Sequence, residues 1–261
     1  MLDYPVKLGS MLFTVVEPHR GHEVAYNRWY ERDHFYAGVM IGPHAFAGRR
    51  FVATRREKAL RYPTDSPVVP DPSQGSYAAI YWVLEGHHDE WNRWAVDQVK
   101  WLHANGRMFA QRDHVYTILA RHEWAAYRDP HGVPAEVALD HPFSGLVAIV
   151  GRRVRDHSQA DLDRWFLEEH LPGVLDGGSV AMCLAFSPLP MLSDSPGDVP
   201  RTDNDRFIHL YFLDGDLDTA WKEHFAELGA HLNASGLGEV LWATPFIPTL
   251  PGTDTYTDEL W

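Results

Sequence analysis

The octapeptide NRWYERDH occupies residues 27–34, and a related octapeptide, DRWFLEEH, occupies residues 163–170. Each copy follows a short apolar run and precedes a second apolar run and a further helix-like segment. A shorter match, IYW at 80–82 against LYF at 210–212, lies downstream of each copy. Self-similarity of this kind is the sequence signature of a repeated structural unit. We therefore predict a chain built from two fused copies of one fold.

Each copy has the pattern strand, helix, strand, strand, helix, strand. Apolar runs bounded by glycine and proline predict the strands, and aromatic residues at helical spacing predict the helices. The first copy gives 11–16, 22–36, 45–54, 77–84, 89–104 and 114–120, with a Pro/Ser/Asp-rich loop at 55–76. The second gives 146–150, 158–170, 180–186, 207–213, 217–232 and 239–247, with a similar loop at 187–205.

This βαββαβ order is that of the ferredoxin-like split motif, in which an antiparallel four-stranded sheet carries two helices on one face. The other face of the sheet must also be covered, and two units packed sheet to sheet cover it. We predict an α+β fold with repeats at 1–125 and 145–261, joined by a connector at 126–144, and a cavity enclosed between the two sheets.

Composition narrows the range of partners. The net charge is −13, which disfavours phosphate backbones and anionic lipid, so neither a nucleic acid nor a membrane is an expected partner. No run approaches the roughly 20 apolar residues of a membrane span. Cys183 is the single cysteine, which excludes an internal disulfide and suits a reducing compartment. We expect a cytoplasmic protein that is a monomer or a homodimer.

The repeated octapeptide places an acid and a histidine at the same helical positions. On a helical wheel, Asp33 falls within the apolar stripe and His34 flanks it, and Glu169 and His170 repeat the arrangement. A carboxylate inside a buried stripe is costly unless it is paired. One interpretation is a cavity in which the histidine transfers protons and the acid sets its pKa and tautomer. The alternative is a structural acid bonded to an arginine of a neighbouring strand, for which the candidates are Arg49, Arg50, Arg152 and Arg153.

Under the functional interpretation, His34 transfers the proton and Asp33 orients it. Tyr30 and Asn27 polarise a carbonyl or hydroxyl group of the substrate, and Trp29 forms part of the pocket wall. In the second half, His209 alternates with Tyr211 on one strand face, which also marks that face as a candidate cavity wall. The predicted substrate-binding residues are Trp29, His170, Glu169, Trp165, His209 and Tyr211.

Both octapeptides resemble the first-helix pattern N-x-W-Y-x-x-x-H of the dimeric α/β-barrel superfamily and its EthD-like branch. The resemblance covers both halves, so it implies a tandem member whose two repeats form internally the barrel that relatives form as dimers. Relatives include muconolactone-type isomerases, polyketide cyclases, cofactor-free quinone-forming monooxygenases and haem enzymes. In several cofactor-free relatives a cavity histidine transfers protons, and His34 is the matching position here.

Other histidines were weighed as metal ligands. The pairs His19/His22 and His87/His88 lie at predicted loop–helix junctions, where capping or solvated histidines are common. Glu31 and His34 have the i, i+3 spacing of bundle metal sites, but the second copy has leucine at the position of Glu31. Phosphate-binding glycine loops and nucleophile elbows are absent. We predict no metal site and no cofactor, with haem or a metal ion as the alternative.

These observations favour a cofactor-independent lyase, isomerase or cyclase that uses a cavity histidine on a small apolar molecule, aromatic or polyketide-like. A non-catalytic protein that binds a small hydrophobic ligand is one alternative, and a cofactor-free monooxygenase is another. A purely structural acid–histidine pair is a third.

Overall fold

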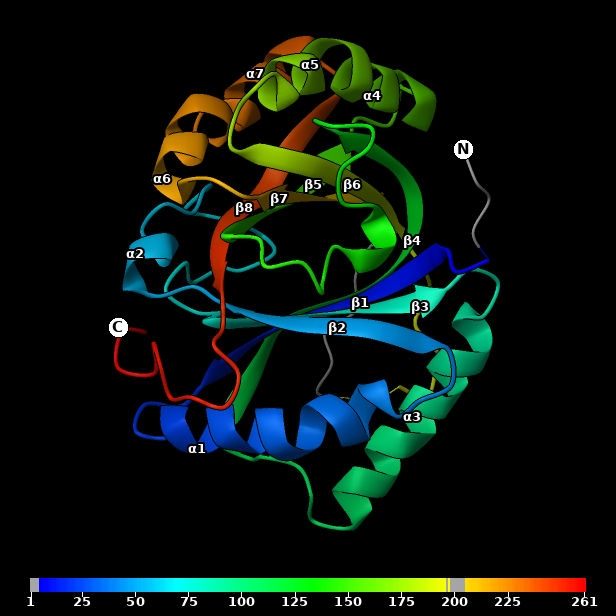
Figure 1. The fold of residues 1–261 in the computed structure, drawn as a ribbon, viewed down its shortest axis with the longest axis vertical. Helices are drawn as coiled ribbons and strands as arrows, with labels where there is room; N and C mark the ends of the chain where they lie inside the picture. Colours follow the sequence, from blue (N-terminus) through cyan, green and yellow to red (C-terminus); the bar gives the residue numbers. More distant parts are fainter. Residues whose placement is uncertain (1–4, 196, 198–204) are drawn as a thin grey trace.

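The computed structural model describes residues 5–195, 197 and 205–261. Its eight strands close into one antiparallel barrel in the order β1-β3-β2-β8-β5-β7-β6-β4 (Figure 1). The strands are β1 Leu8–Pro18, β2 Ala45–Val52, β3 Tyr77–Leu84, β4 Arg112–Tyr127, β5 Gly145–Arg153, β6 Val180–Pro188, β7 Arg206–Leu213 and β8 Gly238–Pro248. Each repeat supplies a four-stranded sheet, and the sheets join at β2–β8 and β4–β6. The fold is therefore the predicted ferredoxin-like α/β barrel within one chain.

The longer helices lie outside the barrel (Figure 1). The helical segments of the first repeat are α1 Glu23–Trp29, η1 Tyr30–His34, η2 Tyr36–Met40, α2 Arg55–Lys58 and α3 His88–Ala104. The connector holds η3 Ala135–Val137, and the second repeat holds α4 Gln159–Trp165, η4 Phe166–His170, α5 Leu171–Leu175, α6 Leu217–Ala220, η5 Trp221–Phe225 and α7 Leu228–Ser235. Helices α1 and α3 lie over the sheet of the first repeat and α4–α7 over that of the second, whereas α2 lies beside β8. Among the described residues, no helix combines the length and apolarity that crossing a bilayer requires.

Side-chain alternation along the strands divides the molecule into an inner core and two outer ones. On β1, Met11, Phe13 and Val15 point into the barrel and are fully buried. They belong to one large apolar cluster with side chains from both repeats, including Leu210 and Trp242. The interior is thus a packed core, and the predicted cavity between the two sheets is wrong. The alternate residues of each strand pack instead beneath the helices.

The two ends of the barrel are closed by irregular segments. The connector places Ala135, Leu139 and Phe143 in the inner core, and the Trp82 indole donates to the Ala135 carbonyl at 3.1 Å. Strand β4 continues to Tyr127, so the connector begins later than the predicted residue 126. At the other side, the buried Arg61 guanidinium donates to carbonyl groups of the 55–76 loop and to Thr244 Oγ1 at 2.9 Å.

The first helix of each repeat widens into a π-turn at the repeated octapeptide. Residues Tyr30–His34 and Phe166–His170 are π-helical, and the 100° wheel used for the sequence does not hold there. Hydrogen bonds of the i→i+5 type add a residue to the turn, which rotates the following side chains. The acids consequently leave the buried stripe: Asp33 is 28 % exposed and Glu169 is exposed. The predicted burial of these two carboxylates is therefore wrong.

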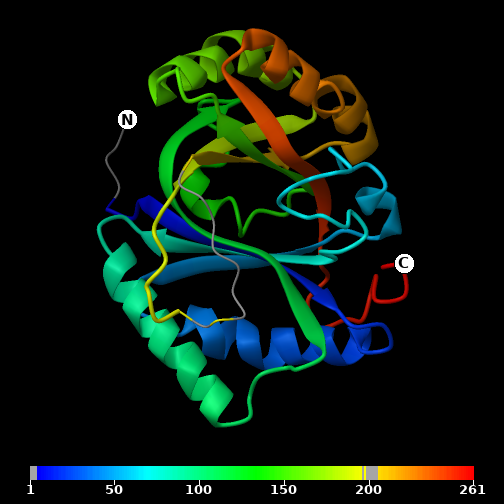
Figure 2. The ribbon, with the colours of Figure 1, turned by 180° about the vertical axis from the view of Figure 1, so that it is seen from behind.

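Two segments of the second repeat extend onto the first. After β8, the tail lies along α1, where Asn27 donates to the Thr253 carbonyl at 2.9 Å. The segment after β6 passes over the first repeat, and Asp194 pairs there with Arg93 and Lys100 of α3 (Figure 2). Of the loop predicted at 187–205, residues 196 and 198–204 lie outside the described residues, as do residues 1–4 of the first predicted repeat.

Candidate functional site

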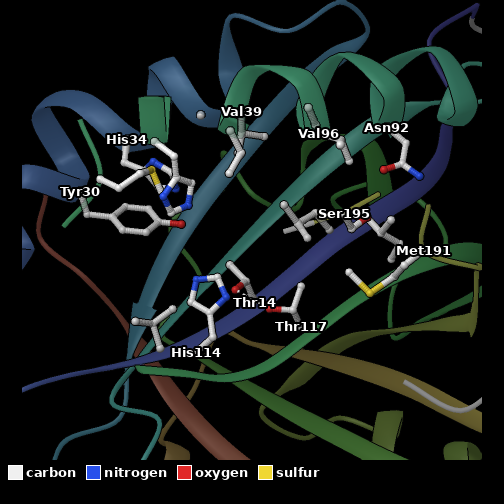
Figure 3. A pocket seen from close by; sticks show the side chains of 18 of the residues that line it. Thr14, Tyr30, His34, Val39, Asn92, Val96, His114, Thr117, Met191 and Ser195 are labelled. Carbon is white, nitrogen blue, oxygen red and sulfur yellow. Dashed lines mark hydrogen bonds between the residues drawn. The ribbon is translucent and has the colours of Figure 1, made fainter. Parts of the chain in front are cut away.

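A cavity of about 120 Å³ lies between the outer face of the first-repeat sheet and the helices that cover it. Alternate residues of β1 and β4 form its floor, and η1, η2 and α3 form its walls. Figure 3 shows Tyr30, His34 and His114 at one end, and Asn92, Met191 and Ser195 at the other. Thr14 and Thr117 lie between the two ends, where their hydroxyl groups are 3.0 Å apart. Most of the remaining lining is apolar.

The π-turn places His34 in this cavity. The imidazole stacks on the Trp29 ring at 4.6 Å between centroids and meets the edge of Tyr30 at 5.3 Å. Trp29 and His34 are five residues apart, which makes them neighbours on a π-turn and not on an α-helix. On the opposite side, Gly38 leaves room for the ring, because a Cβ there would lie 2.8 Å from His34 Cε1. The Nδ1 atom is buried and has no hydrogen-bond partner among the described residues.

The surroundings of His34 keep it neutral. Burial, the largest cause, and the positive charge of Arg112 lower its pKa from 6.5 to about 3. His114 and His103 act in the same direction, whereas Asp33 opposes them weakly. A neutral imidazole at pH 7 can accept a proton from an acidic ligand or donate a hydrogen bond to one. The positive field that opposes protonation of His34 also favours a negative charge on a ligand beside it.

Tyr30 extends the polar end of the cavity. Its hydroxyl group lies 3.0 Å from the hydroxyl of Tyr81, so the two phenols share one hydrogen bond. Burial raises the Tyr30 pKa, so it remains a neutral donor or acceptor. The buried Arg50 guanidinium lies 4.6 Å from the Tyr30 ring centroid. These contacts hold the phenol rigidly beside His34.

Asp33 and Asn27 lie outside the cavity lining. The Asp33 carboxylate accepts hydrogen bonds from Arg107, so it pairs with an arginine and not with His34, as the structural alternative anticipated for such an acid. The arginine comes from the loop before β4 and was not among the predicted partners. Asn27 accepts from Arg50 at 2.8 Å and fastens the C-terminal tail. Neither side chain therefore lies where the predicted direct role in this cavity would require it.

The matching residues of the second repeat do not line the cavity around His34. His170 stacks on Trp165 at an interplanar angle of 4°, which repeats the first π-turn. His209 and Tyr211 share one strand face, as predicted, but both are buried within 1 % exposure under Phe166 and its neighbours. The position four residues after the histidine is Gly38 in the first repeat and the core residue Val174 in the second. Burial lowers the pKa of His170 to about 4 and of His209 to about 3.

The sequence interpretation missed most of the cavity wall. Arg112 lies on β4 two residues before the predicted strand start, and His114 is the first residue of the predicted strand. His103 lies in the last turn of α3. Asn92 lies on the same helix, next to Trp91, which also lines the cavity. Met191 comes from the loop of the other repeat, and no local sequence signal links it to His34. Only the alternation of Thr14 with apolar neighbours on β1 could have indicated a polar position facing the helices.

Comparison with known proteins identifies the fold. No family model matches the chain, and no curated protein matches it in sequence. An anthrone oxidase-like protein aligns over 95% of both chains with a TM-score of 0.57 and 8% identity. A candidate monooxygenase from Fusobacterium nucleatum aligns over 93% of both chains, with a TM-score of 0.53 and 8% identity. A variant of DypB from Rhodococcus jostii in complex with haem aligns over 100% of this chain and 98% of its own, with a TM-score of 0.51 and 9% identity.

These similarities establish a ferredoxin-like dimeric α/β-barrel fold. At 8–9% identity they do not assign a reaction to the chain. One of these structures holds haem, a cofactor that requires a large pocket. Pockets for drug-sized ligands have volumes of roughly 300–1,000 Å³. The cavity of about 120 Å³ is smaller than these, with Met191 and Ser195 closing one end. Histidine side chains that could bind iron line the cavity, but its volume is too small for a haem macrocycle.

Proposed function

We propose that the chain is an enzyme that removes a proton from a small, largely apolar molecule and stabilises the resulting anion. His34 accepts the proton, and Arg112 stabilises the phenolate or enolate that forms. Return of the proton at another atom completes an isomerisation. Attack of the carbanion on a carbonyl carbon of the same molecule, whose oxygen then takes up the proton, completes a cyclisation, and loss of a leaving group from the neighbouring carbon together with the proton completes a lyase reaction. The observation that carries the proposal is a half-buried, neutral imidazole whose buried Nδ1 atom has no partner among the described residues, placed beside a cation in an apolar cavity.

The pKa of His34 sets a condition on this reaction. A base with a pKa near 3 is weak for general base catalysis at pH 7 unless the product of proton transfer is stabilised. Formation of an anion next to the imidazole supplies that stabilisation, because opposite charges attract strongly in a buried site. The substrate group at this end must therefore become negatively charged, as an acidic O–H or an activated C–H group does.

The two ends of the cavity orient the substrate. The ionisable group is expected beside His34, Tyr30 and His114, and the apolar body extends toward Met191 (Figure 3). A volume of about 120 Å³ is comparable to an engineered cavity of about 150 Å³ that binds benzene. We therefore expect a substrate core of one aromatic ring or its aliphatic equivalent within the cavity.

A cofactor-free monooxygenase is the second candidate. The apolar lining, which admits dioxygen as readily as an organic ring, favours it, and two structural neighbours bear names of oxidising enzymes. In that reaction, a substrate carbanion reduces O₂, and a methylene group becomes a carbonyl. One oxygen atom enters the product, and the other leaves as water with the two hydrogens. Oxygen consumption measured during turnover separates this candidate from an isomerase, which consumes none.

The proposal is tested on full-length protein purified from its own host, by native mass spectrometry with an absorbance spectrum. A bound small molecule with an acidic group is expected, and wild-type protein should convert it. His34→Gln should retain binding and lose at least a hundredfold in turnover, because general base catalysis contributes 10²–10⁴-fold. His170→Gln, the same change in the packed repeat, is the matched control and should retain activity. Equal turnover by His34→Gln and wild-type would exclude His34 as the base, and a ligand that wild-type protein binds but does not convert would indicate a binding protein. A Soret band would contradict the cofactor-free mechanism.

A further inference from the structure

A second group of potential ligands lies away from the cavity, at the end of β3. His44 follows the turn after η2, His87 precedes α3, and Glu90 lies in the first turn of α3. One donor atom from each of the three residues lies within 4.8 Å of the other two. None of the three lines the cavity around His34. The group therefore requires an explanation of its own.

The spacing of the donor atoms matches that around a small metal ion. His44 Nε2 is 2.9 Å from Glu90 Oε2, and His87 Nδ1 is 3.8 Å from the same oxygen. Donors at 2.0–2.1 Å from a tetrahedral ion are separated by about 3.3 Å, which lies between these two values. The two imidazole rings are stacked at 3.8 Å with an interplanar angle of 17°. Because a metal ion lies in the plane of each imidazole that binds it, ion binding requires at least one of the two rings to rotate out of the stack.

The backbone holds the two histidines in place before any ion binds. The Leu84 N–H donates to the His44 carbonyl at 3.1 Å, and the His87 N–H donates to the Leu84 carbonyl at 3.1 Å. His44 has φ = +66°, a left-handed conformation that is uncommon for residues other than glycine. Such conformations persist only where the surrounding structure enforces them, and they cluster at ligand-binding sites. In this conformation the His44 side chain lies against His87 and Glu90.

We propose that His44, His87 and Glu90 form a binding site for a divalent transition metal ion of the Zn²⁺ type. Two imidazole nitrogens and one carboxylate are a donor set that zinc accepts, with a fourth position left for water. Mg²⁺ and Ca²⁺ prefer sites made only of oxygen donors and are not expected to bind. Both histidines are partly exposed, so an ion can enter from solvent. The bound ion links the turn after η2 to the start of α3, two elements that frame the cavity.

The site is tested by titrating Zn²⁺ into full-length protein without an affinity tag, in competition with a chromophoric chelator. Wild-type protein should bind one Zn²⁺ per chain, and its Tm should rise with Zn²⁺ but not with Mg²⁺. His87→Ala and Glu90→Gln should each weaken binding at least tenfold. His87 makes no side-chain capping bond to α3, so its removal leaves the helix start intact. His44→Asn serves as a further variant, because asparagine tolerates a positive φ.

His19→Ala is the matched control. His19 Nε2 lies 3.2 Å from a single carboxylate, that of Asp113, so this substitution should leave the zinc affinity unchanged. Zinc affinity that His87→Ala and Glu90→Gln leave unchanged would overturn the proposal, as would wild-type protein that binds no Zn²⁺.

Discussion

The His34 imidazole is the residue on which the proposed chemistry depends, and its position is set by its immediate neighbours. Trp29 supports one face of the ring, and Gly38 allows the ring to approach the helix backbone. Burial and Arg112 keep the imidazole neutral. The acid beside it in sequence stabilises the helix end through Arg107 and does not contact the ring. At this scale, function follows from the burial of the residue and from its charged neighbours.

The lowered pKa of His34 predicts a pH dependence of stability. The unfolded chain binds a proton at His34 below pH 6.5, whereas the folded protein binds it only near pH 3. Stability is therefore complete above pH 6.5 and falls as the pH drops toward 3, by roughly 1.4 kcal/mol per pH unit for each such histidine. In urea unfolding between pH 7 and pH 4, the free energy of unfolding of His34→Gln should fall less steeply with decreasing pH than that of wild-type. The difference in slope should correspond to the uptake of one proton on unfolding. Parallel curves would contradict the assignment.

Gly38 predicts a local effect on the site. In Gly38→Ala, the new methyl carbon would lie 2.8 Å from His34 Cε1, and Trp29 blocks retreat of the ring. We expect turnover to fall at least tenfold, because small misplacements of catalytic groups have large effects on rate. Gly173→Ala is the control, since a Cβ there meets no atom within 4 Å and alanine favours a helix. A Gly38→Ala variant as active as Gly173→Ala would show that the ring position is unimportant.

The strands and the long helix were predictable from the sequence, whereas the two π-turns were not. Strand β3 has the predicted bounds, and α3 begins one residue earlier than predicted, because long apolar or amphipathic runs state their period clearly. The widened turns carry no comparable signal, so a wheel of constant pitch placed Asp33 and Glu169 inward. Trp29, Tyr30 and His34 could be predicted as site residues because the octapeptide that contains them recurs in the second repeat. Arg112 and Met191 were not, because tertiary packing brings them to the cavity from distant segments.

Removing the extra residue of a π-turn tests its role. Arg32 is exposed, and its deletion should restore α-helical pitch and move the histidine off Trp29. We expect this deletion to abolish ligand binding in the cavity. Deletion of Leu167, which is 40 % exposed in the corresponding turn of the second repeat, should leave binding in the first repeat within about threefold of wild-type. Calorimetric titration with the ligand identified by mass spectrometry measures both. Equal loss in the two variants would assign the π-turns a purely structural role.

The whole molecule is a duplication in which the two repeats have taken different tasks. The first keeps a cavity, and the second packs the matching space and supplies segments that complete the first. Its tail holds Asn27 and its β6–β7 loop contributes Met191. Both sheets share one inner core and two closing seams. The second repeat is therefore a structural partner of the site, which a comparison of the two octapeptides alone does not reveal.

The shared core predicts that the repeats unfold together. Leu210 lies in the second repeat and is fully buried in the inner core, so Leu210→Ala should destabilise the protein by about 2–5 kcal/mol. Native-state hydrogen exchange should show the same loss of protection for the most stable amides of β1–β3 and of β5–β7. Reduced protection confined to β5–β8 would mean that the repeats are independent domains.

The central claim is that the first-repeat cavity binds a small acidic molecule as its anion. Absorbance titration with 4-nitrophenol at a pH near the pKa of this probe tests the claim directly, because the phenol and the phenolate absorb at different wavelengths. We predict that wild-type protein binds the probe and shifts it toward the phenolate, that Arg112→Gln reverses the shift, and that His170→Gln leaves it unchanged. Binding of the neutral phenol by wild-type protein, or no difference between wild-type and Arg112→Gln, would contradict the account.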